Sequence, residues 1–120
     1  MRAIKADSFS ADLELRASSL VVLLRGNADM SVHDTFKSFL DEVQQAARKA
    51  KATEAVFDVG ELYFMSSSCL SLVLRFLNAI VELRPSERFT VRFRSNHNLR
   101  WQAKSLAALQ SYAPDIVVIE

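Results

Sequence analysis

The chain has little glycine and little cysteine, and each shortage excludes a class of function. Its 120 residues include two glycines, Gly26 and Gly60, and neither belongs to a glycine-rich run. Dinucleotide fingerprints and phosphate-binding loops both need several closely spaced glycines, so we expect no nucleotide cofactor. Cys69 is the single cysteine. The sequence therefore allows no internal disulfide and no thiolate metal site, and it suits a reducing compartment.

Histidine and net charge are equally scarce. His33 and His97 lie far apart and form no metal-binding pair, so we expect no metal. Fifteen basic and fourteen acidic residues leave a net charge of +1, which gives no support for a nucleic-acid partner. The first twelve residues hold no apolar leader, and the longest apolar run near them, residues 20–24, is far too short to cross a membrane. We expect a cytoplasmic protein without direct membrane insertion.

What remains is a sequence of ordinary globular composition, half hydrophobic and about a quarter charged. Its length is that of one domain, and we expect that domain to span residues 1–120, with a core over about 13–119. Alternating apolar and polar residues, or short apolar runs, predict strands at 13–17, 20–24, 54–59, 89–94 and 116–119. Gly26 and the three residues after it break the pattern, and Gly60 is expected to begin a loop that leads to Phe64.

Helical periodicity fills the longer gaps between these strands. One helix is expected near residues 32–50, capped by Asp29 or Ser31, a second from about 70 to 83, and a third after Asn96 or Asn98. The apolar stripe of the second helix is Leu70, Val73, Leu74, Leu77, Ile80 and Val81, and that of the third is Leu99, Ala103, Leu106 and Leu109. The order β-β-α-β-α-β-α-β predicts an α/β domain with a mixed, mostly parallel sheet of about five strands and three or more helices.

Three consecutive serines stand where the second helix begins, in residues 64–70 (FMSSSCL). A serine at a helix start can cap free backbone N–H groups. The same place favours a phosphate, because these N–H groups and the helix dipole both attract an anion. A hydroxyl here can therefore be a structural cap or a regulatory site, and the residues alone leave both open.

A serine hydrolase is the alternative from the class of enzymes. It would need a nucleophile, a base and an acid brought together by the fold. The residue types are present as Ser67 or Ser68, His33 or His97, and Asp29 or Asp58. These residue types are common and the Gly-x-Ser-x-Gly elbow is absent, so we expect no catalysis.

Three other features have an ordinary interpretation beside a functional one. Arg88, Arg92 and Arg94 alternate along a predicted strand and are either a solvated face or a basic patch for an acidic partner. Trp101 is either a core aromatic or part of a docking surface. Cys69, in a first helical turn, is either a reactive thiolate or a small core residue. We predict the ordinary interpretation in each case.

The element order and residues 64–70 together resemble the STAS domain, the family named for sulfate transporters and anti-sigma factor antagonists. Its signature follows a Phe-Met pair with an aspartate, one or two Ser/Thr residues and Gly-Leu. Phe64, Met65, Ser67, Ser68 and Leu70 match this pattern, whereas Ser66 replaces the usual aspartate and Cys69 the usual glycine. Residues 24–29 (LRGNAD) resemble the loop before the family's first helix. The resemblance covers about residues 13–119.

The resemblance implies a non-enzymatic switch. In bacterial antagonists a serine kinase phosphorylates the hydroxyl after the signature aspartate, which by position is Ser67 here, with Ser66 and Ser68 as second choices. The unphosphorylated form binds the kinase or anti-sigma factor and frees its other client, and a PP2C-type phosphatase resets the switch. The implied partner-binding residues are Gly26, Asn27, Asp29, Tyr63, Met65, Ser66, Ser68 and Arg75. No cofactor is implied.

Two alternatives follow from the same resemblance. Some family members are accessory subunits of ABC or anion transporters. Because Ser66 brings no carboxylate and Cys69 replaces the flexible glycine, the chain can also be a constitutive docking module that keeps the fold without phosphorylation.

Overall fold

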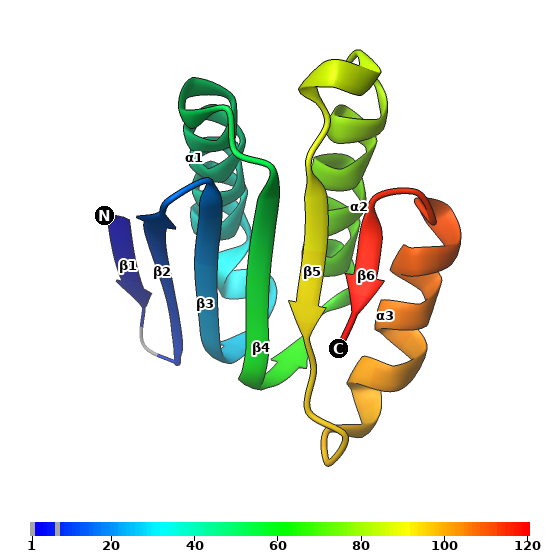
Figure 1. Cartoon of the computed structure of the whole chain (residues 1–120). Coiled ribbons are helices and arrows are strands. Elements are labelled where there is room, and N and C mark those ends of the chain that lie inside the picture. Colours follow the sequence, from blue (N-terminus) through cyan, green and yellow to red (C-terminus); the bar gives the residue numbers. More distant parts are fainter. Residues whose placement is uncertain (1, 7) are drawn as a thin grey trace.

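The described residues form one sheet flanked by helices. The structure is a computed structural model that describes residues 2–6 and 8–120. Its strands are β1 Arg2–Ala6, β2 Phe9–Arg16, β3 Ser19–Ala28, β4 Glu54–Met65, β5 Thr90–Arg94 and β6 Val117–Ile119. They pair in sequence order. The pairs among β1, β2 and β3 are antiparallel, and those from β3 to β6 are parallel (Figure 1).

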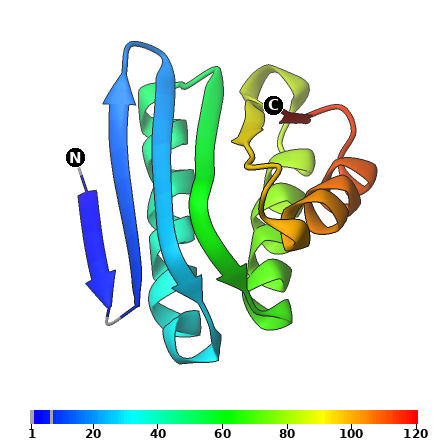
Figure 2. The same cartoon turned by 90° about the horizontal axis from the view of Figure 1, so that it is seen from below.

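A helix joins each pair of parallel strands. The helices are α1 His33–Ala50, α2 Ser67–Val81 and α3 Arg100–Tyr112, with one-turn 3-10 helices η1 Met30–Val32 and η2 Pro85–Glu87. Figure 1 shows α1 and α2 behind the sheet and α3 beside β6. The view from below in Figure 2 shows the chain ends on opposite sides of the molecule. In the described part of the chain, no helix has both the length and the apolar character that a membrane crossing needs.

Phenylalanine rings connect the helices to the sheet. Phe57 of β4 contacts Phe76 of α2 and Phe93 of β5, with ring centroids 5.4 and 5.6 Å apart. On the other side of the core, the rings of Phe9 and Phe36 meet edge to face. Such aromatic pairs add about 0.5–1.5 kcal/mol each to the stability that burial itself gives. The core therefore fixes α1 and α2 against the same face of the sheet.

The predicted α/β class and mostly parallel sheet are confirmed, but the sheet has six strands where about five were predicted. The additional strand is β1, which pairs only with β2. An edge strand with one neighbour needs no strong alternation of apolar residues, so local patterning carries little signal for it. The buried core also begins earlier than residue 13, because Phe9 and Ala11 are buried.

Two predicted interruptions were wrong, because β3 continues through Ala28 and β4 through Met65. Pairing between these two strands supplies the backbone hydrogen bonds that local propensity did not predict. Gly26 has φ of +91°, and a Cβ there would lie 2.0 Å from the Ser8 carbonyl oxygen. Glycine is therefore required inside the strand at this position.

The predicted helix faces were partly wrong. In α2, Val73, Leu77 and Ile80 are buried as predicted, but Val81 is exposed, and Cys69, Leu72 and Phe76 complete the buried face. Because α2 is apolar around most of its circumference, periodicity alone does not select the face that packs. In α3 the buried polar residue Gln102 stands where Ala103 was expected, and Ala103 is exposed.

The predicted side-chain caps of the first and third helices were wrong. Asp29 accepts a hydrogen bond from the Ser31 N–H and so caps η1, while α1 begins without a side-chain cap. Leu99 occupies the cap position of α3 and makes no side-chain hydrogen bond there. The side chain of Asn96 instead accepts from the N–H of Asn98, which stabilises the loop before the helix.

Candidate functional site

Ser66 builds the start of α2. It has extended backbone angles (φ −67°, ψ 159°), and its hydroxyl oxygen accepts from the N–H of Cys69 at 3.1 Å. Its own N–H donates to the carbonyl of Ala28 at 2.8 Å, which ties the helix start to the end of β3. The hydroxyl of Ser68 lies 3.3 Å from that of Ser66. Ser66 is therefore the structural cap, and Ser68 supports it.

Ser67 is the first residue of α2 and is exposed. Its carbonyl accepts from the hydroxyl of Ser71 at 3.1 Å. Its own hydroxyl makes no hydrogen bond to the described part of the chain. Of the three consecutive serines, Ser67 thus presents the hydroxyl most freely to another molecule.

The electrostatic surroundings of this helix end are unusual. The first turn of α2 contains no acidic side chain, so no residue of that turn offsets the positive end of the helix dipole. Cys69 lies in the same turn but is fully buried. Burial raises the pKa of the Cys69 thiol, and its hydrogen bond with Ser66 lowers it by a smaller amount. The predicted role of Cys69 as a small core residue is confirmed. In this turn an added anion would therefore be attached at the exposed Ser67 and not at the buried thiol.

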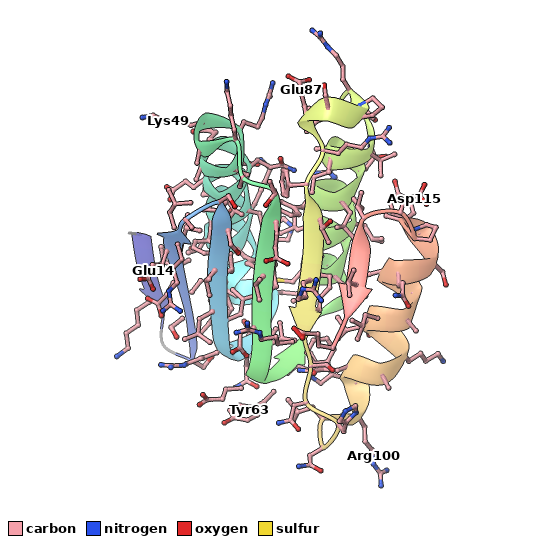
Figure 3. The ribbon with its side chains drawn as sticks, in the orientation of Figure 1. Glu14, Lys49, Tyr63, Glu87, Arg100 and Asp115 are labelled. Atoms are coloured by element: carbon pink, nitrogen blue, oxygen red, sulfur yellow. The ribbon has the colours of Figure 1, made fainter. Side chains whose placement is uncertain are left out.

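Three exposed apolar side chains surround the start of α2, and we call them the apolar rim. They are Met30, Tyr63 and Phe64, with exposed fractions of 74%, 57% and 47%. Figure 3 shows Tyr63 at the lower end of the molecule, where β4 leads into α2. Large exposed apolar groups beside a polar centre are typical of a protein-docking surface.

The exposure of Tyr63 results from an irregular strand. The pairing of β3 with β4 joins Gly26 to Leu62 and Asn27 to Phe64, so Tyr63 has no opposite residue. An extra residue of this kind is a β-bulge, which bends the strand and redirects side chains. The bulge therefore turns Tyr63 toward solvent close to Ser67.

The amino-terminal part of α3 and the loop before it hold the bulged strand in place. The Gln102 amide, 1% exposed, donates to the carbonyl of Val59 at 2.6 Å. The Trp101 indole N–H donates to the carbonyl of Leu62 at 3.0 Å, and the Asn96 amide donates to the carbonyl of Gly60 at 2.9 Å. These side chains satisfy backbone groups that a regular ladder would otherwise pair. Trp101 is partly buried against the core, which agrees with the ordinary interpretation of a core or half-core aromatic.

Most of the predicted partner-binding residues come together at this end of the fold. They are Asn27, Asp29, Tyr63, Met65, Ser66 and Ser68, all at the ends of β3 and β4 or in the first turn of α2. Gly26 lies beside them, but the close approach of Ser8 explains its presence structurally. Met30 and Phe64 were not predicted as binding residues. The only available signal was a large apolar residue next to an expected turn.

Arg75 lies apart from this group. It is eight residues beyond Ser67, about 12 Å along the helix axis, and it borders a depression of about 90 Å³ between α1 and α2. Lys37, Asp41 and Gln44 of α1 line the other side. Arg75 is exposed, but it is not among the predicted residues that come together near Ser67.

The two histidines that a hydrolase could use as a base differ in their surroundings. His33 contacts its neighbour Asp34, with 3.0 Å between Nδ1 and Oδ1, and His97 lies in the loop before α3. In the part of the chain that the structure describes, neither imidazole hydrogen bonds the Ser67 hydroxyl, which a general base must do at some stage. The described residues also contain no group of three potential metal ligands.

The predicted arginine face is only partly present. Arg92 and Arg94 lie on the same face of β5, where they pair with Glu54 and Glu120 at 3.0 and 3.6 Å. Arg88 lies outside the strand, contrary to the prediction. Its guanidinium donates to backbone carbonyls at the end of α2.

Solved structures share this fold at low sequence identity. An anti-sigma factor antagonist from Mycobacterium paratuberculosis aligns with a TM-score of 0.67 and 15% identity, covering 92% of this chain and 86% of that one. The anti-sigma factor antagonist SpoIIAA in its unphosphorylated form gives 0.57 and 19%, covering 92% and 87%. The Bacillus cell fate determinant SpoIIAA in the phosphorylated form gives 0.55 and 18%, covering 92% and 90%.

No family model and no curated protein matches the sequence. The structural likeness nevertheless covers nearly the whole chain. The chain has the STAS-like fold of anti-sigma factor antagonists, as the resemblance in residues 64–70 implied.

Proposed function

We propose that this chain is a non-enzymatic regulatory domain that binds another protein through the amino end of α2, and that phosphorylation of Ser67 controls the binding. One observation carries the proposal. The free hydroxyl of Ser67 lies at the positive end of a helix, beside the exposed apolar rim. The fold shared with anti-sigma factor antagonists supports a protein partner such as an anti-sigma factor.

The physical effect of phosphorylation would differ between the chain and its partner. A phosphate adds about −1.5 to −2 charges at neutral pH. The fold tolerates this charge because free N–H groups and the dipole of α2 favour an anion. A partner packed over the rim would have to desolvate or match a dianion. A coupling of about 1–3 kcal/mol, roughly five- to 150-fold in affinity, is sufficient for a switch.

The partners that fit this scheme are a serine kinase that also acts as an anti-sigma factor and a PP2C-type phosphatase, in the cytoplasm. The solved structures with this fold include one antagonist in a phosphorylated and an unphosphorylated form. Ser66 favours a second candidate, because it caps α2 without the negative charge of an aspartate. In that case the same surface docks constitutively, for example on a transporter.

The first test is the intact mass of tagged protein isolated from its native cells. We expect one added phosphate in the wild type and none in Ser67→Ala. Ser68→Ala is the matched control, because its hydroxyl lies in the same turn but contacts Ser66, and it should keep the phosphate. A phosphate retained by Ser67→Ala, or absent under all growth conditions, contradicts the switch.

The second test measures affinity for the protein that copurifies with the wild type. Ser67→Asp should weaken binding about five- to 150-fold, while Ser71→Asp, on the next turn and also exposed, should change it much less. Tyr63→Ala should weaken binding whether or not Ser67 is modified, because an exposed aromatic side chain that becomes buried in an interface contributes strongly. Loss in Tyr63→Ala with no effect of Ser67→Asp would favour the constitutive docking module.

A further inference from the structure

A hollow of about 740 Å³ lies at the end of the molecule opposite to the apolar rim. It is formed where the carboxyl end of α1 meets η2 and the residues just before β4. Figure 3 shows Lys49 and Glu87, which line it, at the upper end of the view and Tyr63 at the lower end. A volume of this size is in the usual range for a small-molecule site.

The lining of this hollow is strongly positive, and we call it the basic hollow. Glu87 is the one acidic residue among the lining residues that the structure describes. Four cations against one carboxylate leave a surplus of three positive charges, whereas the entire chain has a surplus of one. The positive charge of the protein is therefore concentrated here. The four exposed cations are Arg48, Lys49, Lys51 and Arg88.

Cations near the carboxyl end of a helix often serve the helix itself, but the backbone closes α1 without them. Lys51 has left-handed angles (φ 52°, ψ 46°), and its N–H donates to the carbonyl of Arg48 at 3.2 Å. The N–H of Ala52 donates to the carbonyl of Ala47 at 2.9 Å. These are the two hydrogen bonds of a Schellman motif. The side-chain cations of this segment are therefore not what closes the helix.

The same cations have donors to spare. Within the described part of the chain, Arg48, Lys49 and Lys51 make no ion pair and no side-chain hydrogen bond. Arg88 uses Nε and Nη2 for backbone carbonyls at the end of α2. Because a guanidinium carries five N–H donors, its Nη1 group remains available. An anion in the basic hollow can therefore be bound without breaking a contact of the fold.

Lys51 is the most informative of these residues. The left-handed position of a Schellman motif is usually occupied by glycine, because a Cβ is unfavourable there. Lys51 nevertheless places a long cationic side chain at this position, and that side chain lines the basic hollow. A role for the ammonium group in binding accounts for a lysine where glycine suits the backbone better.

The remaining lining residues indicate the class of ligand. No aromatic ring is among the lining residues that the structure describes, so a nucleotide base has nothing to stack on. Ala47 and Ala52 are small and buried, and the exposed Thr53 and Ser86 add hydroxyl groups. Guanidinium, ammonium and hydroxyl groups are the donors that phosphate oxygens accept from.

We propose that the basic hollow binds a ligand that carries two or more phosphate groups and no aromatic base. One phosphate brings about −1.5 to −2 charges at neutral pH, which is less than the surplus of three on the lining. The phosphates belong either to a free polyphosphate or to the headgroup of a phosphorylated lipid. The chemistry at the protein is the same for both sources.

This site does not depend on the proposed switch. The basic hollow and the apolar rim lie at opposite ends of the molecule. A phosphate ligand and a protein partner can therefore be bound at the same time. If the ligand is a lipid headgroup, the apolar rim points away from the membrane and remains open to the partner.

Two binding measurements on the whole chain test the proposal and distinguish the two sources. Calorimetric titration with inorganic tripolyphosphate in about 50 mM salt should give Kd on the order of 100 µM. About 300 mM salt should raise this Kd at least about fivefold, because exposed charges are screened. Cosedimentation with phosphatidylcholine vesicles that contain about 5% phosphatidylinositol bisphosphate measures binding to the headgroup. Tighter binding to these vesicles than to tripolyphosphate would identify the lipid as the source.

Lys51→Gly separates binding from stability. It removes the ammonium group and places the preferred residue at the left-handed position, so Kd should rise at least about fivefold while the thermal unfolding midpoint stays the same or rises. A lysine that only stabilises the fold would give the opposite result, a lower midpoint with unchanged Kd. Glu87→Gln should lower Kd about two- to threefold, because it removes the carboxylate of the lining.

Lys104→Gln is the matched control for Lys51→Gln. Lys104 is exposed on α3, outside the lining, and has no ion pair within the described residues, so its loss should leave Kd unchanged. The proposal is overturned if tripolyphosphate binds with Kd above about 5 mM and the vesicles do not bind. It is equally overturned if Lys51→Gly binds like the wild type, if Lys104→Gln weakens binding as much as Lys51→Gln, or if a hexaglutamate peptide binds more tightly than tripolyphosphate.

Discussion

The two ends of α2 are completed in different ways. At the carboxyl end, the Arg88 guanidinium donates to the carbonyls of Val81 at 2.7 Å and Leu83 at 3.1 Å. A cation there offsets the negative end of the helix dipole and occupies free carbonyl groups. At the amino end, Ser66 supplies a neutral cap, and the first turn has no acidic side chain. The chain thus places a cation at the carboxyl end of the helix, whereas at the amino end the nearby carboxylate, Asp29, comes from just after the end of β3 and not from the helix.

This difference supports the proposal that the amino end of α2 is the one that binds another molecule. The carboxyl end has its charge partner within the chain. The amino end combines a free hydroxyl at Ser67, a first helical turn without an acidic side chain and the apolar rim. Figure 3 shows the two ends at opposite limits of the molecule, marked by Glu87 near one and Tyr63 near the other. An anion can be added at the amino end without displacing a contact of the fold.

The largest expected loss of stability comes from removing Gln102, whose amide supports the strand that leads to the amino end of α2. Gln102→Leu removes the amide that donates to the carbonyl of Val59 and also contacts the carbonyl of Leu62. Because these carbonyls lie against a fully buried side chain, leaving one unpaired should lower the free energy of unfolding by about 2–3 kcal/mol. Urea denaturation measures this loss. Gln110→Leu is the matched control, since Gln110 is exposed and makes only a long contact of 3.4 Å, and it should cost less than about 0.5 kcal/mol.

The same substitution also tests whether the contacts of α3 with β4 are needed for partner binding. If the bulge positions Tyr63, Gln102→Leu should also weaken partner binding under conditions in which the variant is fully folded. Normal binding by a folded but destabilised variant would mean that the bulge does not depend on α3 for its shape.

A smaller effect is expected at the carboxyl end. Arg88→Met keeps the apolar part of the side chain but removes the hydrogen bonds to the last residue of α2 and to Leu83 just beyond it, and it should lower the unfolding free energy by about 1 kcal/mol. Arg84→Met is the control, because Arg84 is highly exposed and only 3.8 Å from Glu87, a type of pair that contributes little. Equal losses in the two variants, measured by urea denaturation, would remove the claim that Arg88 neutralises this helix end.

The sequence predicted the features that local rules determine. Serines before an apolar stripe indicated the start of α2 near Ser66, and the alternation in β5 indicated its strand. The same serines identified the place of the candidate site. These features depend on residues close together in the chain, which is why one sequence was enough to find them.

The rest depended on contacts between distant segments. The extension of β4 past Gly60 follows from pairing with β3, and the burial of Gln102 follows from carbonyls about forty residues earlier. Neither contact has a local signature. The exposure of Met30 and Phe64 was also not predictable, because a large apolar residue is usually buried. Which side of α2 faces the core was ambiguous for a different reason. Apolar residues occur around most of this helix, so their spacing does not select one face.

The most direct test of the difference between the helix ends is the stability of charge variants at Ser67. We expect Ser67→Asp to raise the unfolding free energy by about 0.3–1 kcal/mol relative to Ser67→Lys in low salt, because the amino end of α2 favours an anion. About 1 M salt should reduce the difference, since Ser67 is exposed and its charge is screened. A Ser67→Lys variant as stable as Ser67→Asp, or more stable, would contradict the account.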